Sequence, residues 1–523
     1  MKVKSVITCV AVAAIVVVLS TGHEFALAAP PAGEVTIVQP EFGNGVVIPY
    51  LAIPRGNDWL QMIYDQVVGT TPEGKYSTET GLANKWEMSR DGLTWIFNIR
   101  KGVKFHDGVE LTAKDVKFSL DLLMRPDAVV GEASDFKKEV KSMDVKDPYT
   151  LVIQLKQPDI TFLNLLSNIE SYASMVVPKD YYEKVGKDEF QKRPIGSGPF
   201  KLHSIRVGDF IKLEATDRHW RDGVPRFKYM TFRTIPEESS RLAMLKTGEA
   251  DISRISRAVL KEAEKSGLNI ITKQNAGCVI LKPNMQWTSP VFSDIRFRKA
   301  LNLAIDKEAI IKQLLAGIPK PIATFPGANV SVVGGDPSLK PYPYAPQEAA
   351  RFVKEGGWEG YEFTLISYPR TGLPEFPLIV EALAGYWQKV GLKPKISMTE
   401  YSAFREPWRN RKSQNTIHGY ESTTAPDVGM LLVKFQEEWY YYHNSNRSSV
   451  NIPELNERFG RIQKTLDIAE ISKLMAEIYR YAYDNYLMIP ICEIPDLIAT
   501  TKKVPKWNPG LRNDRNYYEM IRQ

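Results

Sequence analysis

A strand–helix–strand pattern over residues 361–399 leaves few folds open to this chain. Residues 363–366 form a short apolar run, and residues 379–390 then carry apolar side chains at helical spacing. Gly391 stands where a helix ends and positive φ is favoured, and residues 395–398 form the next strand. Two strands joined by a helical crossover pair in parallel. The pattern therefore predicts an α/β fold class, with a largely parallel sheet covered by helices.

Length and charge narrow the class of protein further. The chain has 523 residues, of which 43% are hydrophobic and 25% are charged. This length corresponds to about three domains of ~150 residues, and the composition excludes a disordered tail, a collagen-like fibre and a disulfide-rich miniprotein. The formal charge of +7 is spread over the whole chain. This distribution argues against a nucleic-acid-binding stripe and against a polybasic membrane anchor.

Two further helices are marked by their first turns. Thr112, followed three residues later by Asp115, has the spacing of a capping box. A second helix is expected to start near Asp294. Its inward residues are expected to include Phe297, Leu301, Ala304 and Ile305, and its outward residues to be Arg296, Arg298 and Lys299. Residues 319–346 are rich in Pro and Gly and indicate a long ordered loop. Helices over about 454–467 and 470–486, then a strand over 487–491, are expected near the C-terminus.

The first 29 residues have the pattern of an export signal. Lys2 and Lys4 precede an apolar run over residues 6–19, and the Ala-Leu-Ala sequence at 26–28 fits signal peptidase. The apolar run is shorter than the ~20 residues that a membrane-spanning helix needs. We expect cleavage after Ala28 or Ala29. Since Cys9 lies inside the apolar run and not at the junction, no lipid anchor is expected.

The two other cysteines, Cys278 and Cys492, both lie in apolar contexts. In an oxidising compartment they could form a disulfide, but spacing alone does not show whether their Cα atoms come close enough. We expect two separate buried thiols.

Motifs for catalysis and for metal binding are absent from the sequence. There is no His-Glu-x-x-His, no phosphate-binding Gly-rich loop and no Cys-x-x-Cys. Ser197 lies in a Gly-Ser-Gly segment, but Pro199 is incompatible with the helix that a nucleophile elbow must begin, so a tight turn is expected. His106 beside Asp107 and Gly108 is expected to belong to a structural turn. The histidines of the exported chain lack metal-ligand spacing, so no metal and no cofactor are expected.

Aromatic and charged residues gather in two stretches, 401–427 and 438–444. Each aromatic residue taken singly is more typical of core packing. Aromatic walls with a few converging polar groups are nevertheless what a small-molecule cleft requires, and the clustering with arginines in expected loops favours a binding site.

The order of several motifs resembles that of the family 5 (peptide/nickel-type) extracellular solute-binding proteins of ABC importers. These motifs, in chain order, are IYDQVVG at 63–69, GLANKWE at 81–87, DGLTWIF at 91–97, IRKGVKFHDG at 99–108, PIGSGPF at 194–200, HWRDG at 219–223, GEADI at 248–252 and DIRFRKA at 294–300. The resemblance covers nearly the whole chain after the signal, in order and at the family's spacing.

The resemblance implies a two-lobed, periplasmic-binding-protein-like α/β fold with an additional α+β domain inserted in the first lobe. Lobe I would comprise residues 30–74, 191–275 and 496–523, the inserted domain residues 75–190, and lobe II residues 276–495. Crossovers near 277–279 and 494–496 would form the hinge. The implied function is a periplasmic receptor that captures an oligopeptide or another small polar solute between the lobes. It would be a monomer that delivers the solute to an ABC permease and ATPase complex, and it would bind no nucleic acid.

The resemblance also points to ligand-binding positions. Peptide binders of this family hold the ligand's ammonium with an aspartate, and Thr423 stands at that position. Either Glu421 substitutes for the aspartate, or the ligand has no free α-ammonium. Arg370 lies near the position of a carboxylate-binding arginine, and Arg405 and Arg409 could hold an anionic group instead. The full expected set comprises Phe42, Asn44, Arg370, Arg405, Trp408, Arg409, Tyr420, Glu421, Thr423, Thr424, Asp427 and Tyr442.

Other functions remain open at this point. A non-peptide ligand, such as an opine, an oligosaccharide or a metal chelate, is compatible with the same fold. A secreted hydrolase and a non-transport role as a chaperone or chemoreceptor partner are the alternatives from other classes.

Overall fold

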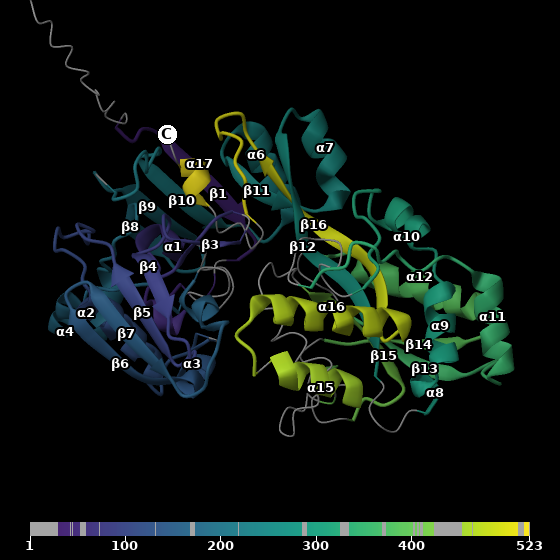
Figure 1. Cartoon of the computed structure of the whole chain (residues 1–523). Coiled ribbons are helices and arrows are strands. Elements are labelled where there is room, and N and C mark those ends of the chain that lie inside the picture. Colours follow the sequence, from purple (N-terminus) through teal and green to yellow (C-terminus); the bar gives the residue numbers. More distant parts are fainter. Residues whose placement is uncertain are drawn as a thin grey trace, which may run out of the picture.

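The computed structural model describes residues 30–41, 43, 45–52, 59–72, 74–130, 132–167, 173–217, 219–284, 290–324, 334–368, 373–400, 403–404, 407, 412–422, 452–462, 464–510 and 517–521. In these residues the chain forms a ten-stranded sheet, a four-stranded sheet and a two-stranded ribbon, with helices packed around them (Figure 1). The expected α/β fold class is confirmed.

The ten-stranded sheet runs through both halves of the molecule. Its strands, in spatial order, are β14 (Lys393–Met398), β13 (Glu362–Ser367), β15 (Thr416–Ser422), β12 (Asn269–Pro283), β16 (Ile489–Thr500), β11 (Ile252–Ile255), β1 (Glu34–Gln39), β10 (Tyr229–Thr234), β9 (Phe210–Ala215) and β8 (Phe200–Arg206). Strands β13, β14 and β15 are parallel to one another, and β1 is parallel to β10 and to β11. The sheet therefore contains two parallel groups on either side of β12 and β16.

Strands β12 and β16 join the two parallel groups. They pair antiparallel, and the register shifts between Lys273 and Gly277 of β12. On one side of this irregularity β12 pairs with β15, and on the other side β16 pairs with β11. A large hydrophobic cluster packs around each group, one containing Val35 and Phe232 and the other containing Leu365 and Trp387. β16 extends to Thr500, well past the strand over 487–491 that the sequence predicts.

The strand–helix–strand unit forms as predicted. β13 leads into α12 (Phe376–Lys389), which contacts both β13 and β14. Gly391 follows the helix with φ of 95°, a value that favours glycine, and β13 pairs in parallel with β14 from Glu362↔Lys393 onward. Local spacing and a helix-ending glycine were sufficient to identify this unit.

The two marked helix starts are also confirmed. Thr112 and Asp115 form a capping box at the start of α2 (Ala113–Asp121), and Asp294 accepts a hydrogen bond from the Arg296 N–H at the start of α9 (Ile295–Leu303). The predicted outward position of Arg298 is wrong. Arg298 is buried, and its guanidinium donates to the carbonyl oxygens of Phe292, Ser293 and Asn485, because the C-terminal ends of α8 and α16, with their free carbonyl acceptors, meet beside it.

The four-stranded antiparallel sheet has its own covering helices. Its order is β4 (Ala83–Met88), β5 (Thr94–Ile99), β7 (Thr150–Leu155) and β6 (Val140–Asp147), and α2 contacts β6 and β7. The other helical segments of this region are η2 (Leu122–Met124), α3 (Ala133–Glu139), η3 (Phe162–Leu166), α4 (Lys179–Val185) and α5 (Lys187–Lys192). Figure 1 shows this sheet beside β1, β8, β9 and β10. A two-stranded ribbon of β2 (Gly69–Thr70) and β3 (Tyr76–Ser77) lies near it.

The remaining helices surround the ten-stranded sheet. They are η1 (Pro49–Leu51), α1 (Leu60–Ile63), α6 (Glu238–Thr247), η4 (Arg257–Val259), α7 (Leu260–Lys265), α8 (Pro290–Ser293), α10 (Lys307–Leu314), α11 (Pro346–Glu355), α15 (Pro453–Ile462), α16 (Ile468–Asp484) and α17 (Tyr517–Ile521). Between α10 and α11 the described residues contain neither a helix nor a named strand, as predicted for residues 319–346. No helix among the described residues is long and apolar enough to cross a membrane.

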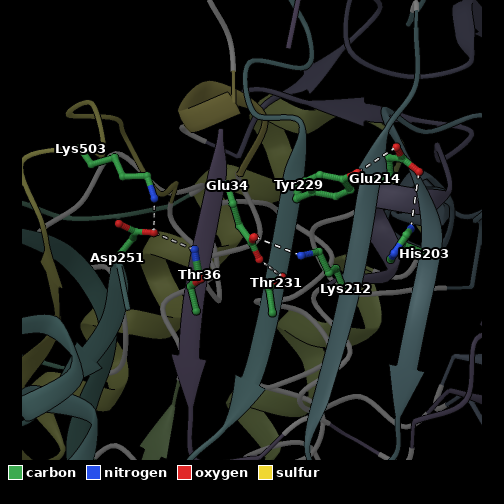
Figure 2. Close-up of polar contacts among 9 residues, drawn as sticks. All are labelled: Glu34, Thr36, His203, Lys212, Glu214, Tyr229, Thr231, Asp251 and Lys503. Carbon is green, nitrogen blue, oxygen red and sulfur yellow. Dashed lines mark hydrogen bonds and ion pairs between the residues drawn. The ribbon is translucent and has the colours of Figure 1, made fainter. Parts of the chain in front are cut away.

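One face of the sheet formed by β1, β8, β9 and β10 is polar (Figure 2). Val35, Met230 and Leu213 are buried on the opposite face, and their neighbours in sequence carry the charges. Glu34 accepts from Thr231 Oγ1 at 2.6 Å and from Lys212 Nζ at 3.1 Å. Burial raises the pKa of Glu34, but these two donors outweigh burial and leave its pKa below the ordinary value. The alternation of apolar and charged residues thus matches a sheet with one solvated face.

Each of the two joining strands carries one of the cysteines. Cys278 of β12 stands opposite Glu493, and Cys492 of β16 stands opposite Val279. Each side chain is buried, as expected from the apolar sequence contexts, and both are thiols. Because successive residues of a strand point to opposite faces, this register directs the two sulfur atoms to different faces of the sheet.

Candidate functional site

The carboxyl ends of both parallel groups converge on the irregular middle of β12 and β16. β11 ends at Ile255, opposite Leu497 of β16. β15 ends at Ser422, opposite Cys278 of β12, and Cys278 in turn pairs with Glu493 of β16. The two strand ends are therefore separated by a short stretch of β16. In open α/β sheets, ligands bind outside the carboxyl ends of the strands, so this convergence is the candidate site.

Two of the expected ligand-binding residues belong to a described strand. Tyr420 and Glu421 are among the last three residues of β15, opposite Ile280 and Val279 of β12, at the converging edge. The other expected positions lie outside the described residues: Phe42, Asn44, Arg370, Arg405, Trp408, Arg409, Thr423, Thr424, Asp427 and Tyr442. The export signal over residues 1–29 also lies outside them.

The backbone at this edge is held by aromatic packing. Tyr368, directly after β13, donates from its hydroxyl to the carbonyl oxygen of Gly419 at 2.8 Å. A Cβ on Gly419 would lie 2.0 Å from Cζ of Phe376, so the ring occupies the space that any larger residue would need. Tyr368 and Phe376 contact each other with ring centroids 5.2 Å apart. This packing fixes the backbone of β15 directly before Tyr420 and Glu421.

A pair of buried basic side chains on β12 and β15 was not predicted from the sequence. Lys282 of β12 stands opposite His418 of β15, and both are almost fully buried. Burial, together with the nearby charge of Lys282, lowers the pKa of His418 to about 3, so the imidazole is neutral. A lysine inside the apolar run of β12 is the signal that could have identified the pair, because lysine is seldom fully buried without a specific partner.

The Gly196–Ser197–Gly198 segment is a buried bend and not a nucleophile elbow. Ser197 is followed after two residues by β8, a strand, whereas an elbow leads into a helix. Cβ atoms on Gly196 and Gly198 would lie 2.0 Å from the Ile63 carbonyl oxygen and 2.6 Å from the Ile63 carbonyl carbon. The predicted tight turn is confirmed, and the glycines allow it to pack on the chain just before Asp65.

The carboxylate of Asp65 is the centre of this packing. Asp65 Oδ2 accepts from Ser197 Oγ at 2.9 Å and from Trp220 Nε1 at 2.9 Å, and His219 Nε2 lies 3.4 Å away. Burial raises the pKa of Asp65, but His219 and the hydrogen bonds from Trp220 and Ser197 outweigh burial and leave the pKa below its ordinary value. In a Ser-His-Asp triad the histidine lies between the other two residues. Here the carboxylate lies between them, so the arrangement is not that of a Ser-His-Asp triad.

His106 closes the same bend from the other side. Its Nδ1 accepts from the Gly196 N–H at 3.2 Å, which leaves the proton on Nε2, and Nε2 donates to the Gly198 carbonyl oxygen at 2.9 Å. The ring is therefore a structural clamp on the turn. This role agrees with the prediction that His106 is a structural residue.

Comparison with protein families matches residues 77–440 to the bacterial extracellular solute-binding proteins, family 5. The matched segment includes the four-stranded sheet, the joining strand β12 and the strand ends of β11 and β15, whereas the joining strand β16 lies outside it. The chain belongs to family 5.

Individual relatives agree with this assignment. The family 5 chain is 32% identical over 290 residues to the glutathione-binding protein GsiB of Salmonella paratyphi A, a match covering 55% of this chain and 54% of GsiB. It thus spans about half the length of that relative. It is 27% identical over 470 residues to the oligopeptide-binding protein AppA of Bacillus subtilis, covering 84% of each. The fold is similar to that of the ABC transporter substrate-binding protein CtaP of Listeria monocytogenes, with a TM-score of 0.80, 21% identity, and coverage of 94% of this chain and 99% of CtaP.

Within the described part of this family 5 chain, no group of three or more His, Cys, Asp or Glu side chains lies close enough together to hold a metal ion.

Proposed function

We propose that this chain is a periplasmic solute-binding receptor that captures a small ligand between two lobes and delivers it to the permease and ATPase of an ABC importer. The observation that carries the proposal is the family 5 match over residues 77–440. The export pattern over residues 1–29 supports a location outside the cytoplasmic membrane. We further propose that the receptor is a monomer that binds no nucleic acid and has no catalytic activity.

The proposed lobes follow the two parallel groups of strands. Lobe I comprises residues 30–74, 191–275 and 496–523, the inserted domain residues 75–190, and lobe II residues 276–495. The irregular pairing between β12 and β16 near Gly277 supports a hinge at this point. A ligand that contacts both lobes would favour their approach, because it binds the closed arrangement more tightly than the open one.

The proposed ligand is a small polar solute, with oligopeptides and glutathione as the first candidates. The names of AppA and GsiB supply these two classes. In the proposed site Tyr420 contributes an aromatic wall, and Glu421 contributes the carboxylate that would hold an ammonium group. Arg409, Arg405 and Arg370 are the proposed anion-binding residues, and Thr423, Thr424, Asp427, Trp408, Tyr442, Phe42 and Asn44 complete the proposed contacts.

Calorimetric titration of the purified protein tests the proposal. The panel comprises short peptides, glutathione, opines, oligosaccharides and metal chelates, each checked in parallel by thermal shift. At least one member is expected to bind, and Asp427→Ala and Arg409→Ala are each expected to weaken it on the order of tenfold without lowering the stability of the unliganded protein. A panel without a single binder would contradict the receptor function, and unchanged affinity in both variants would reject the site.

A separate measurement addresses the hydrolase alternative. The arrangement around Asp65 gives no support to Ser197 as a nucleophile. We expect no turnover of generic ester and peptide substrates. Turnover that disappears in Ser197→Ala, with the fold retained, would contradict the proposal and favour a hydrolase.

A further inference from the structure

A buried ion pair connects the two halves of the molecule beside the point where the strand ends converge. Arg257 is the first residue of η4, two residues after β11 ends. Glu375 directly precedes α12 on the other side of the joining strands. Arg257 Nη1 lies 3.7 Å from Glu375 Oε2, and the two side chains are 5% and 12% exposed.

The arginine is anchored on its own side and on the joining strand. The preceding residue, Ser256, donates from its N–H and from its hydroxyl to the carboxylate of Glu238 at 2.5 and 2.7 Å. Arg257 Nη2 donates to the carbonyl oxygen of Pro495 at 2.8 Å. Pro495 stands between Ile494 and Asp496, whose partners Gly277 and Lys273 flank the irregularity in β12. Arg257 thus contacts the proposed hinge itself.

The contact between Arg257 and Glu375 is an ion pair that is too long to be a hydrogen bond. A separation of 3.7 Å exceeds the distance of a charge-assisted hydrogen bond. Among the residues that the structure describes, no hydrogen-bond partner lies within reach of the buried atoms Arg257 Nε and Glu375 Oε2. The attraction between the two groups is therefore mainly coulombic, and it acts in a water-poor setting where it is screened less than at the surface.

Rotation of the halves would act on the two contacts of Arg257 in different ways. The bond to Pro495 lies at the pivot and can persist, whereas Glu375 lies beyond the pivot and moves with the other half. Separation of the halves lengthens the Arg257–Glu375 distance and admits water to both charges. The pair therefore stabilises the arrangement in which the two halves are close over the arrangement in which they are apart. A contact with such a difference in free energy shifts the populations of the two arrangements.

We propose that Arg257 and Glu375 form a positioning pair that sets the open–closed balance of the unliganded receptor. The inference rests on the two-lobed function proposed above and adds to it a named contact that acts before any ligand binds. Neither residue belongs to the expected ligand-binding set. The pair acts through the lobe arrangement, so its loss reduces the affinity for every ligand by the same factor, namely the factor by which the closed fraction falls.

Distance measurements between spin labels on the two halves test the pair without a ligand. Labels are attached at Lys265→Cys of α7 and Lys354→Cys of α11, both exposed, while Cys278 and Cys492 are buried. Glu375→Gln keeps the Arg257–Pro495 bond and removes the charge. We expect it to move the distance distribution toward longer separations, with the open-to-closed ratio rising roughly fivefold to tenfold, between the effects of exposed and buried pairs.

Matched variants separate this effect from general damage. Glu381→Gln removes an exposed carboxylate from the same helix, and Lys261→Met removes an exposed cation close to Arg257. Both are expected to leave the distribution unchanged. Arg257→Met is expected to act like Glu375→Gln. Because Arg257→Met could also lose structure together with the Pro495 bond, Glu375→Gln with an unchanged thermal unfolding curve is the deciding variant.

The possible outcomes distinguish this inference from the proposed function. A folded Glu375→Gln protein whose distances equal those of Glu381→Gln overturns the positioning pair, whatever the ligand panel shows. A panel without a binder, combined with longer distances in Glu375→Gln, contradicts the receptor function and leaves the pair standing. Where a peptide or glutathione does bind, the dissociation constant of Glu375→Gln is expected to rise by the factor by which the closed fraction falls in the spin-label measurement.

Discussion

His106 Nδ1 accepts a hydrogen bond from the Gly196 N–H at 3.2 Å, and this contact requires a neutral imidazole. Burial lowers the pKa of His106 to about 4. The unfolded chain, with a histidine pKa of about 6.5, therefore takes up this proton first as the pH falls. The contribution of His106 to the free energy of unfolding is fully present above about pH 6.5 and is lost as the pH falls toward 4. Between pH ~6.5 and ~5 this contribution decreases by about 2 kcal/mol.

Urea denaturation at a series of pH values checks this prediction. His106→Asn is expected to lower the stability near pH 7 and to flatten the decline over the acid range. His203→Asn serves as the matched control, because this half-exposed histidine pairs with Glu214 on the solvated face of the sheet and not with the bend at Gly196. An identical acid decline in wild type and His106→Asn would show that the turn does not depend on the neutral ring.

Gly419→Ala tests the packing beneath Tyr420 and Glu421. The added Cβ would lie 2.0 Å from Phe376 Cζ, so the ring or β15 must move. We expect a loss of roughly 1–3 kcal/mol in the free energy of unfolding, as for other overpacked cores. Gly385→Ala is the matched control, because its Cβ would meet nothing within 4 Å on α12, and it should be neutral or stabilising by up to about 1 kcal/mol. Equal stability of the two variants would contradict the close approach.

Local rules were sufficient where the contact partners are close in sequence. The capping box of Thr112 and Asp115, the end of α12 at Gly391 and the bend at Ser197 were all predicted from neighbouring residues, and all are observed. Each depends on backbone geometry within a few residues. Interactions between residues this close in the chain can be recognised from the sequence alone. The helices and strands, and with them the α/β class, could therefore be predicted.

Contacts between distant segments could not be derived in the same way. The exposed position predicted for Arg298 was wrong, because the acceptors beside it come from Phe292, Ser293 and Asn485, and the last of these belongs to the end of α16. The meeting of Arg257 with Glu375 likewise depends on how β11 and α12 are placed around β16. The ligand-binding set remains a prediction. Of its members, Tyr420 and Glu421 lie in the described strand β15, and the other positions lie outside the described residues.

Glu139 gives a pH dependence of the opposite sign to that of His106. Burial raises the pKa of Glu139, and the neighbouring Asp159 carboxylate raises it further, so the folded protein keeps this carboxyl protonated. The unfolded chain releases the proton near pH 4.3. Its stabilising contribution is complete below that value and declines as the pH rises through the elevated pKa. Glu139→Gln, a neutral isostere, is expected to be more stable than wild type near pH 8 and to lose this part of the alkaline decline.

Denaturation curves for Glu139→Gln are compared with those for Glu87→Gln, in which an exposed carboxylate of β4 is replaced. The exposed residue should leave the alkaline decline unchanged. An alkaline decline in Glu139→Gln as steep as that of wild type would show that the carboxyl is ionised in the folded protein.

Gly92 tests a contact between the proposed inserted domain and lobe II. Gly92 lies in the turn between β4 and β5 with φ of 70°. A Cβ on this residue would lie 2.7 Å from Leu466 Cδ1 and 2.9 Å from Pro158 Cβ. Gly102 has a similar φ of 76° with nothing within 4 Å, so Gly102→Ala measures backbone strain alone, about 1–2 kcal/mol. Gly92→Ala is expected to cost roughly 1–3 kcal/mol more. In a double-mutant cycle with Leu466→Ala the two changes should couple favourably, because the shorter side chain makes room for the new methyl group. Additive effects in that cycle would mean that the turn at Gly92 and the side chain of Leu466 are not in contact in solution.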